Sequence, residues 1–139
     1  MKIEVIIPYA PVAKARPRMT KTGHAYTPEK TRQYEKIVQF CFNKKYGCMQ
    51  QPLTDKPVSV TLLFYMPIPK SFSKKKIAEL RQNKMACPKK PDIDNLTKAV
   101  LDALNGRAYK DDNQIVELFA RKEYSEQPRT EIFISFKDS

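Results

Sequence analysis

Residues 90–115 of this 139-residue chain read KPDIDNLTKAVLDALNGRAYKDDNQI, and they hold five of its seven aspartates. The middle of the stretch has the apolar spacing of an amphipathic helix from about Asn95 to Asn105, and Gly106 is a natural stop. Two aspartates precede this helix and two follow it. Because the whole chain carries a formal net charge of +11, such a gathering of acids requires an explanation.

The length of the helix allows its flanking aspartates to meet. Eleven helical residues rise about 1.5 Å each, or about 16 Å together, and a six-residue extended connection covers that length. The chain that follows the helix can therefore return Asp111 and Asp112 to the level of Asp92 and Asp94. If the strand that follows continues the alternation, Asp112 shares the better apolar face, which should pack against the helix. We therefore expect Asp112, rather than Asp111, to point toward Asp92 and Asp94.

Clustered carboxylates repel one another unless a cation joins them. Oxygen ligands without a nearby set of Cys or His side chains suit a hard cation, so we expect Mg²⁺, with Mn²⁺ as a possible substitute. His24 is the only histidine, which leaves little material for a histidine-based triad or zinc site. Lys98 lies four residues after Asp94 and four before Asp102, on the same side of the helix. Its ammonium could therefore reach charge that develops on a phosphoryl group.

Each of these features also has an ordinary structural explanation. Asp92 or Asp94 could simply cap the helix. Two adjacent aspartates before a strand often form a turn. Lys98 and Asp102 could be a surface ion pair worth about 0.2–0.5 kcal/mol. From the residues alone these alternatives stay open beside the metal site.

The flanking sequence predicts one α+β domain over residues 1–139, with a small mixed sheet packed against helices in the order β-α-β-α-α-β-β. Residues 11–26 contain two prolines and a glycine among basic residues, so we expect them to form a loop. Apolar alternation and β-branched residues indicate the strands, and the 3.6-residue period indicates the helices. The expected strands are residues 2–7, 57–69, 113–124 and 129–137, and the expected helices run from Thr27-Pro28 to Gly47, from Ser73 to about Asn83, and from about Asn95 to Asn105.

Composition narrows the class of protein. Hydrophobic residues make up 41% of the chain, which argues against disorder, and no run of 18 apolar residues predicts a membrane span. The three cysteines, at positions 41, 48 and 87, lack metal-ligand spacing and are typical of free thiols in a reducing cytosol, so we expect a cytoplasmic protein. The pI of about 9.6 indicates a polyanionic partner, and nucleic acid is the commonest one.

Two basic segments are candidates for phosphate contacts. The loop KARPRMTK gathers four cations around a stiff proline, and the segment PKKPD adjoins the proposed metal site. Positions of this kind typically contact the phosphate backbone, although a solvated basic loop has the same composition. The residues expected to contact DNA are Lys14, Arg16, Arg18, Lys89 and Lys90.

PDIDNLTKAVLDALNG, followed by YKDDNQIVEL, closely resembles the signature of the RusA family of Holliday-junction resolvases. KARPRM, AYTPEKTRQYEKIV and the closing strands are also similar, so the resemblance covers nearly the whole chain. It implies a Mg²⁺-dependent endonuclease, bacterial or phage-encoded, that acts as a homodimer on four-way DNA junctions. The metal-binding residues of the family match Asp92, Asp94 and Asp112, and its catalytic lysine matches Lys98. Pro91 stands where some relatives carry a basic residue.

The leading hypothesis is therefore an endonuclease that resolves four-way junctions in recombination and repair. A homodimer suits this substrate because two symmetric nicks call for two identical sites related by a two-fold axis. One alternative is a metal-dependent nuclease that acts on another branched DNA or RNA. Another is a basic nucleic-acid-binding protein without enzymatic activity, but such a protein gains nothing from aspartates on its nucleic-acid face.

Overall fold

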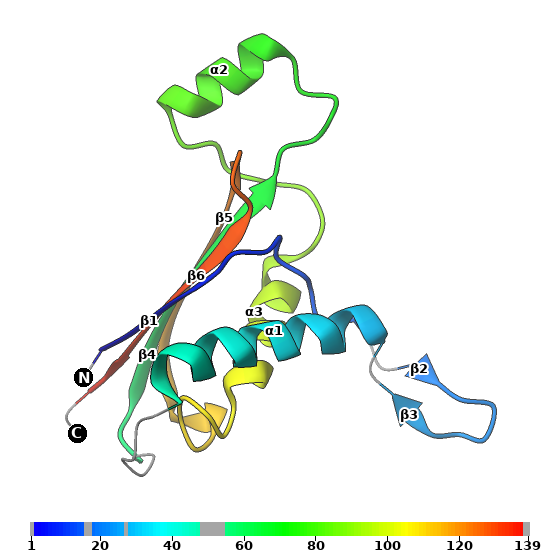
Figure 1. The fold of residues 1–139 in the computed structure, drawn as a ribbon, viewed down its shortest axis with the longest axis vertical. Helices are drawn as coiled ribbons and strands as arrows, with labels where there is room; N and C mark the ends of the chain where they lie inside the picture. The colour runs from blue at the N-terminus through cyan, green and yellow to red at the C-terminus, as the bar shows by residue number, and fades with distance from the viewer. Residues whose placement is uncertain (1, 16–17, 27, 48–54, 138–139) are drawn as a thin grey trace.

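The computed structural model of the chain describes residues 2–15, 18–26, 28–47 and 55–137. The expected α+β class and the single small domain are confirmed (Figure 1). The main elements follow the expected order, with a two-stranded hairpin added inside the predicted loop. They are β1 Lys2–Ile7, β2 Arg18–Met19, β3 Ala25–Tyr26, α1 Glu29–Tyr46, β4 Val58–Pro67, α2 Lys74–Gln82, α3 Ile93–Leu104, the 3-10 turn η1 Asp112–Gln114, β5 Ile115–Ser125 and β6 Arg129–Phe136.

The main sheet is mixed, as expected, with the strand order β1-β6-β4-β5. β6 runs antiparallel to both β1 and β4, whereas β4 and β5 are parallel. A parallel pair cannot be joined by a tight turn, and the connection from β4 to β5 accordingly contains α2 and α3. This connection delivers α3 next to the edge strand β5, where the candidate site lies.

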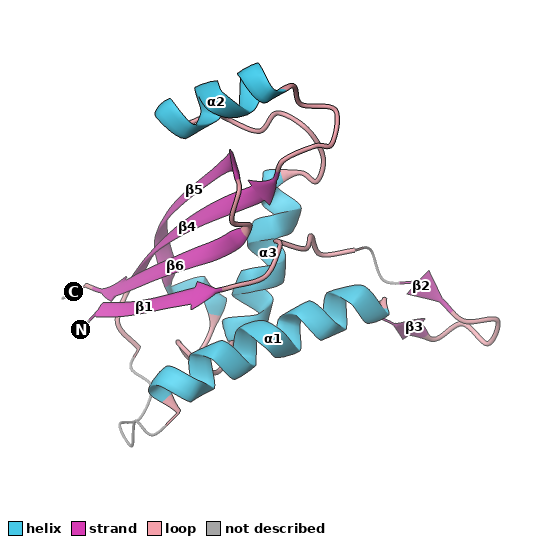
Figure 2. Ribbon diagram, turned by 45° about the horizontal axis from the view of Figure 1, so that its top comes forward, coloured by secondary structure: helices cyan, strands magenta, loops and turns pink. Residues whose placement is uncertain are grey.

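The core lies between one face of the sheet and the helices α1 and α3 (Figure 2). Alternation of side chains decides that face: in β1 every second residue is buried, beginning with Ile3, and β4 and β6 repeat the pattern. The apolar stripe predicted for α3 is confirmed in full, since all of its members are buried. These are Leu96, Ala99, Val100, Ala103 and Leu104.

α1 begins one residue after Pro28, which occupies the N-cap position, and it ends at Gly47 as expected. Gly47 does not adopt a left-handed conformation, because its φ is −64°. A Cβ atom there would instead lie 2.4 Å from the carbonyl oxygen of Asn43, so close approach of the backbone explains the glycine. Near the start of α1, the buried hydroxyls of Tyr34 and Thr130 form a 2.8 Å hydrogen bond that ties α1 to the sheet.

Two features lie outside this core. α2 begins where expected, with the Ser73 hydroxyl accepting a hydrogen bond from the backbone of Lys76, and it sits beyond the end of the sheet (Figure 1). The β2–β3 hairpin projects from the side of the domain near the start of α1 (Figure 2). Its turn contains Gly23 at φ 86°, a conformation that favours glycine.

Two of the three cysteines lie within the described residues. Cys41 is half-buried and Cys87 is buried, and both are free thiols. Cys48 lies outside the described residues. Within the described part of the chain, no helix has the length and apolar character needed to cross a bilayer.

Candidate active site

α3 presents two aspartates at its beginning. Asp92 is the N-cap residue, yet its side chain makes no capping hydrogen bond, and Asp94 lies in the first turn. Both side chains are exposed. Among the described residues neither carboxylate forms a hydrogen bond or an ion pair, so the structure does not support capping as their role.

The two adjacent aspartates after α3 have different surroundings. Asp111 precedes the 3-10 turn, and its carboxylate accepts a 3.0 Å hydrogen bond from the backbone of Asn113. The side chain of Gln114 in turn accepts a 2.9 Å hydrogen bond from the Asp111 backbone, which completes a capping box. Asp111 is therefore committed to the turn. Asp112 makes no such bond and lines a cavity against α3.

Asp112 was expected at the beginning of a strand, and this expectation was wrong. Residues 112–114 form a 3-10 turn, and the strand begins only at Ile115. The capping box explains the difference, since it closes a turn where an extended chain was expected. Leu118 nevertheless lines the same cavity as Asp112, but Val116 and Leu118 are both exposed, so the expected packing of this apolar row against the helix is not confirmed.

A cavity of about 520 Å³ separates α3 from β5, and it collects most of the candidate residues. One wall comes from successive turns of α3, where Asp94, Lys98 and Asp102 are spaced four residues apart on one side of the helix. Asp112 and two residues of β5 form the opposite wall. The complete lining is Ile93, Asp94, Thr97, Lys98, Leu101, Asp102, Asp112, Leu118 and Ala120.

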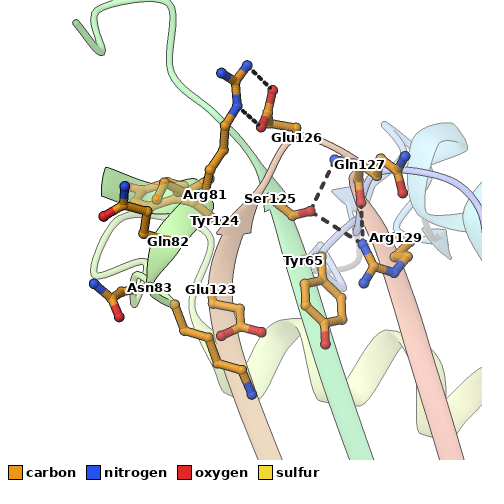
Figure 3. Close-up of a pocket in the computed structure, with 12 residues that line it drawn as sticks. Tyr65, Arg81, Gln82, Asn83, Glu123, Tyr124, Ser125, Glu126, Gln127 and Arg129 are labelled. Atoms are coloured by element: carbon orange, nitrogen blue, oxygen red, sulfur yellow. Dashed lines mark hydrogen bonds and ion pairs between the residues drawn. The ribbon is translucent and has the colours of Figure 1, made fainter. Parts of the chain in front are cut away.

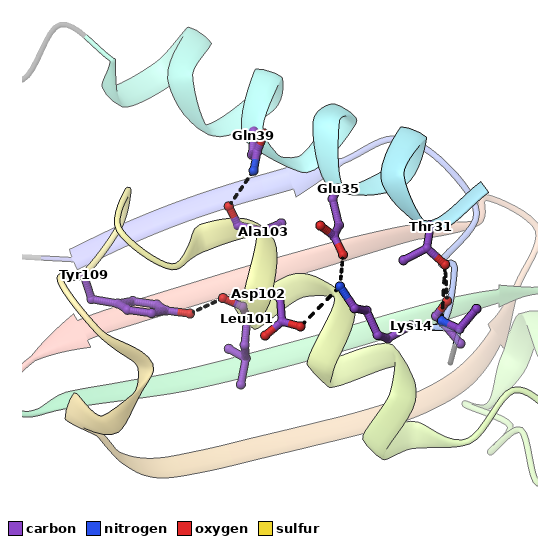
Figure 4. A network of polar contacts seen from close by, with 10 residues as sticks. Lys14, Thr31, Glu35, Gln39, Leu101, Asp102, Ala103 and Tyr109 are labelled. Carbon is purple, nitrogen blue, oxygen red and sulfur yellow. Dashed lines mark hydrogen bonds and ion pairs between the residues drawn. The ribbon is translucent and has the colours of Figure 1, made fainter. Parts of the chain in front are cut away.

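Lys98 does not form the surface pair that was considered as its alternative role. Its side chain is exposed at the cavity and makes no ion pair with any residue that the structure describes. Asp102 is instead 3.4 Å from the ammonium of Lys14, which also contacts Glu35 at 2.6 Å (Figure 4). The ammonium of Lys98 thus remains available to an anion that enters the cavity.

Lys14 joins three parts of the fold next to the cavity. The N-terminal segment carries its backbone, α1 supplies Glu35, and α3 supplies Asp102. Partial burial alone would lower the pKa of Lys14, but the carboxylates of Glu35 and Asp102 outweigh it and the pKa is raised. The ammonium therefore stays charged and partly neutralises the acidic wall of the cavity.

The remaining residues expected to contact DNA are placed only in part. Arg16 lies outside the described residues, and so does the side chain of Arg18. Lys89 and Lys90 are exposed in the segment that leads into Asp92. The same segment is held by Lys122 of β5, a contact that the sequence does not reveal because both of its acceptors are backbone carbonyls.

The carboxylates around Asp112 crowd one another. A hydrogen bond with the Asp111 carboxyl is the main cause that raises the pKa of Asp112, followed by slight desolvation of this exposed group and by the charges of Asp111 and Asp102. Ionised Asp112 is therefore unfavourable in the protein alone. A bound cation would relieve that repulsion.

We expect Asp112→Asn to raise the melting temperature of the metal-free protein slightly near pH 7, because the carboxylate is exposed and its repulsion is screened by solvent. An acid with a raised folded-state pKa destabilises the folded protein above that pKa, whereas below its ordinary pKa it is protonated in both states and has no effect. The gain should therefore vanish near pH 3, as measured by thermal unfolding in the presence of a chelator. Asp55→Asn, at an exposed carboxylate paired with Lys110, is the control and should show no gain. A lower melting temperature for Asp112→Asn near pH 7 would contradict the repulsion.

The carboxylates have the chemistry that a hard cation needs. In this structure, however, they do not lie close enough together to bind one. Asp94 and Asp112 line the same cavity, while Asp92 is not part of its lining. No three acidic, histidine or cysteine side chains among the described residues lie close enough together to hold a metal ion. Asp92 adjoins the α3 wall and its carboxylate has no hydrogen bond there, so rotation of its side chain is not opposed by an existing contact.

A second and larger cavity, of about 680 Å³, lies between α2 and the end of β5 (Figure 3). Its arginines are already engaged: Arg81 forms two hydrogen bonds with Glu126, at 2.7 and 2.9 Å, and Arg129 donates to Ser125 and to the backbone of Gln127. The aspartates of α3 and of the turn before β5 are not among its lining residues. The smaller cavity is therefore the candidate active site.

Comparison with known proteins identifies the family of the chain. The model of a family described as "Endodeoxyribonuclease RusA" matches residues 8–135. The chain is also similar to "Uncharacterized protein YqaN" of Bacillus subtilis (strain 168), with 38% identity over 129 residues that cover 89% of each chain.

The protein is thus an endodeoxyribonuclease, an enzyme that hydrolyses phosphodiester bonds within DNA. More particularly, it belongs to the RusA family, which confirms the resemblance seen in the sequence. Membership of this family implies Holliday-junction resolvase activity, and its resolvases depend in general on a divalent metal.

Proposed function

We propose that this protein is a Mg²⁺-dependent endonuclease that resolves four-way DNA junctions by paired, symmetric nicks during recombination and repair. The observation that carries the proposal is the cavity between α3 and β5, where Asp94 and Asp112 lie with a lysine that has no ion pair among the described residues. Family membership supports the same activity.

We infer the following division of labour among the site residues. Asp92, Asp94 and Asp112 would hold Mg²⁺, which Mn²⁺ could replace, and the bound cation would supply Lewis acidity toward a phosphate oxygen. Lys98 would donate hydrogen bonds to the phosphoryl oxygens as negative charge develops on them. The neighbouring Lys14–Asp102 contact would hold the α3 wall in place, since it ties α3 to the N-terminal segment.

We also propose that the protein acts as a homodimer in the cytoplasm of a bacterium, encoded by the host or by a phage, and that residues 1–139 form one RusA-like domain. Two copies related by a two-fold axis would present two identical sites to the two strands that must be cut. The test is the molar mass in solution, with and without a four-way junction. A junction that binds a single copy would contradict the paired mechanism.

The proposal is tested with end-labelled four-way junction, flap and duplex DNA, each with Mg²⁺ and with a chelator. We expect symmetric nicks in the junction only, and only with Mg²⁺. Preferred cleavage of the flap would instead favour the alternative of a nuclease for another branched substrate. Binding of the junction without cleavage of any substrate would favour a protein that only binds nucleic acid.

We expect binding of the junction to weaken steeply with salt, with a log–log slope of about −0.9 for each phosphate neutralised on the duplex arms. Combined replacement of Arg16 and Arg18 by Ala should make the slope shallower, because two cations of the basic loop are lost. Lys44→Ala, an exposed position at the opposite end of α1, is the control for the loss of charge alone. The measurement is a titration of binding affinity across a series of salt concentrations. An unchanged slope for the double variant would exclude the loop from the phosphate contacts.

A further inference from the structure

Backbone hydrogen bonds to β5 fasten only the first half of the segment that leads into the acidic end of α3. The backbone N–H of Tyr124 donates to Met85 at 2.9 Å, and that of Cys87 donates to Lys122 at 3.2 Å. These bonds make the segment a short extra strand beside β5, and they stop at Cys87. The next four residues, 88–91, include two prolines, which have no N–H to donate.

The ammonium of Lys122 fastens the second half. Its Nζ donates hydrogen bonds to the carbonyl oxygens of Lys89 and Pro91, each at 2.7 Å. Among the described residues Lys122 has no ion pair with a carboxylate, so these two carbonyls are its polar partners. Hydrogen bonds from a charged donor are stronger than those from a neutral one, and here they span the residues directly before Asp92.

We infer that Lys122 is a positioning residue for the metal site, an inference that rests on the function proposed above. Pro91 is bonded directly to Asp92, and the carbonyl of Asp92 accepts the first hydrogen bond of α3, from Leu96 at 3.1 Å. Holding the Pro91 carbonyl on β5 therefore fixes where α3 begins relative to the opposite wall of the cavity. Lys122 thereby sets the distance between the two aspartates of α3 and Asp112, which comes from the other wall.

This role differs from general support of the fold. Among the described residues Lys122 forms no ion pair with either aspartate, and the hydrophobic core beneath α3 does not include it. Loss of the ammonium should therefore leave the domain folded but free the beginning of α3 from β5, so that a binding cation has to order it. Loss of a residue that orients metal ligands typically weakens metal affinity by about 10–100-fold, and we expect the lower end because Lys122 acts through the backbone.

The test measures the affinity of the free protein for Mn²⁺. Electron paramagnetic resonance detects the binding, at a temperature far below that of unfolding. We expect Lys122→Met to weaken Mn²⁺ binding about 10-fold. The Mg²⁺ concentration for half-maximal junction cleavage should rise by the same factor. Lys122→Arg keeps two donors and should restore most of the affinity. Arg121→Met, the loss of a cation one residue away on the same strand, should bind Mn²⁺ like the unmodified protein.

The outcomes separate this inference from the proposed function. Unchanged Mn²⁺ affinity in Lys122→Met, whatever its melting temperature, would overturn the positioning role. If Lys122→Met does not fold, Lys122→Gln, which keeps one donor without charge, decides by the same criterion. If the unmodified protein binds Mn²⁺ but cleaves no junction, the proposed function fails, while the effect of Lys122 on Mn²⁺ affinity still decides the inference. An unmodified protein that binds no Mn²⁺ overturns both.

Discussion

Replacing any one of Asp92, Asp94 and Asp112 by Asn is expected to abolish junction cleavage while junction binding survives. A catalytic metal supplies several kcal/mol of transition-state stabilisation, which corresponds to a rate loss of about 10³-fold or more. Each substitution keeps the size of the side chain but removes the negative charge that a hard cation needs. Binding could even tighten, because a carboxylate that repels phosphate is removed. The measurement is single-turnover cleavage beside an independent binding titration.

Asp111→Asn is the matched control for this series. Asp111 is adjacent to Asp112 and carries the same charge, but its carboxylate caps the turn before β5. Asn is an equally good capping residue, so the turn should persist and the rate should change little. Full cleavage by any one of the three site variants at ordinary Mg²⁺ would remove that residue from the metal site.

Lys98→Met is expected to lower the single-turnover rate by about 10²–10³, the effect of losing one donor aimed at developing charge. The structure removes the main competing explanation, since Asp102 pairs with Lys14 and not with Lys98. Stability should hardly change, because Lys98 has no ion pair among the described residues. Lys98→Arg should rescue poorly, since a planar fork does not replace a compact ammonium in a confined site.

A titration with Mg²⁺ separates the two roles that Lys98 could have. If Lys98 acts on the phosphoryl group, the rate of Lys98→Met stays low at every Mg²⁺ concentration, and the half-saturating concentration changes little. Recovery of the normal rate at high Mg²⁺ would mean instead that Lys98 shapes the metal site. Arg107→Met, an exposed cation just beyond α3 and outside the cavity lining, is the control.

The fold could be predicted from the sequence where apolar residues recur at regular spacing because they lie on a buried face. The stripe from Leu96 to Leu104 is apolar at helical spacing because that face of α3 packs on the sheet, and its burial follows directly from the pattern. Alternation in β1 and β4 worked for the same reason. The boundaries of α3 were off by one or two residues, which is usual where a helix end is set by local hydrogen bonds.

Local turn chemistry was harder to predict. The capping box of Asp111 and Gln114 converts an apparent strand beginning into a 3-10 turn, and the adjacent aspartates alone do not specify it. The β2–β3 hairpin lies in a stretch whose prolines and glycine predict a loop, and its strands have only two residues each with all of their described side chains exposed. Neither element carries an apolar period that could have marked it.

Side-chain contacts between residues far apart in the sequence could not be predicted. Spacing and charge pointed to the aspartates and Lys98, which the resemblance to the RusA family matches, but neither revealed that Lys14 is held by Glu35 and Asp102. Those partners lie 21 and 88 residues away along the chain, so no local spacing records them. The sequence likewise gives no sign of the contacts between Lys122 and two backbone carbonyls, because every residue has a carbonyl.

The central claim is that Asp94 and Asp112 on the two walls of one cavity, together with Asp92 beside it, hold a single kind of hard cation. The most direct measurement is a crystal structure of Lys98→Met with a four-way junction and Mn²⁺, using the anomalous scattering of manganese to locate the metal. The predicted result is a peak about 2.0–2.3 Å from carboxylate oxygens of Asp92, Asp94 and Asp112, beside a DNA phosphate. A peak held by other carboxylates, or ordered carboxylates with no peak between them, would contradict the account.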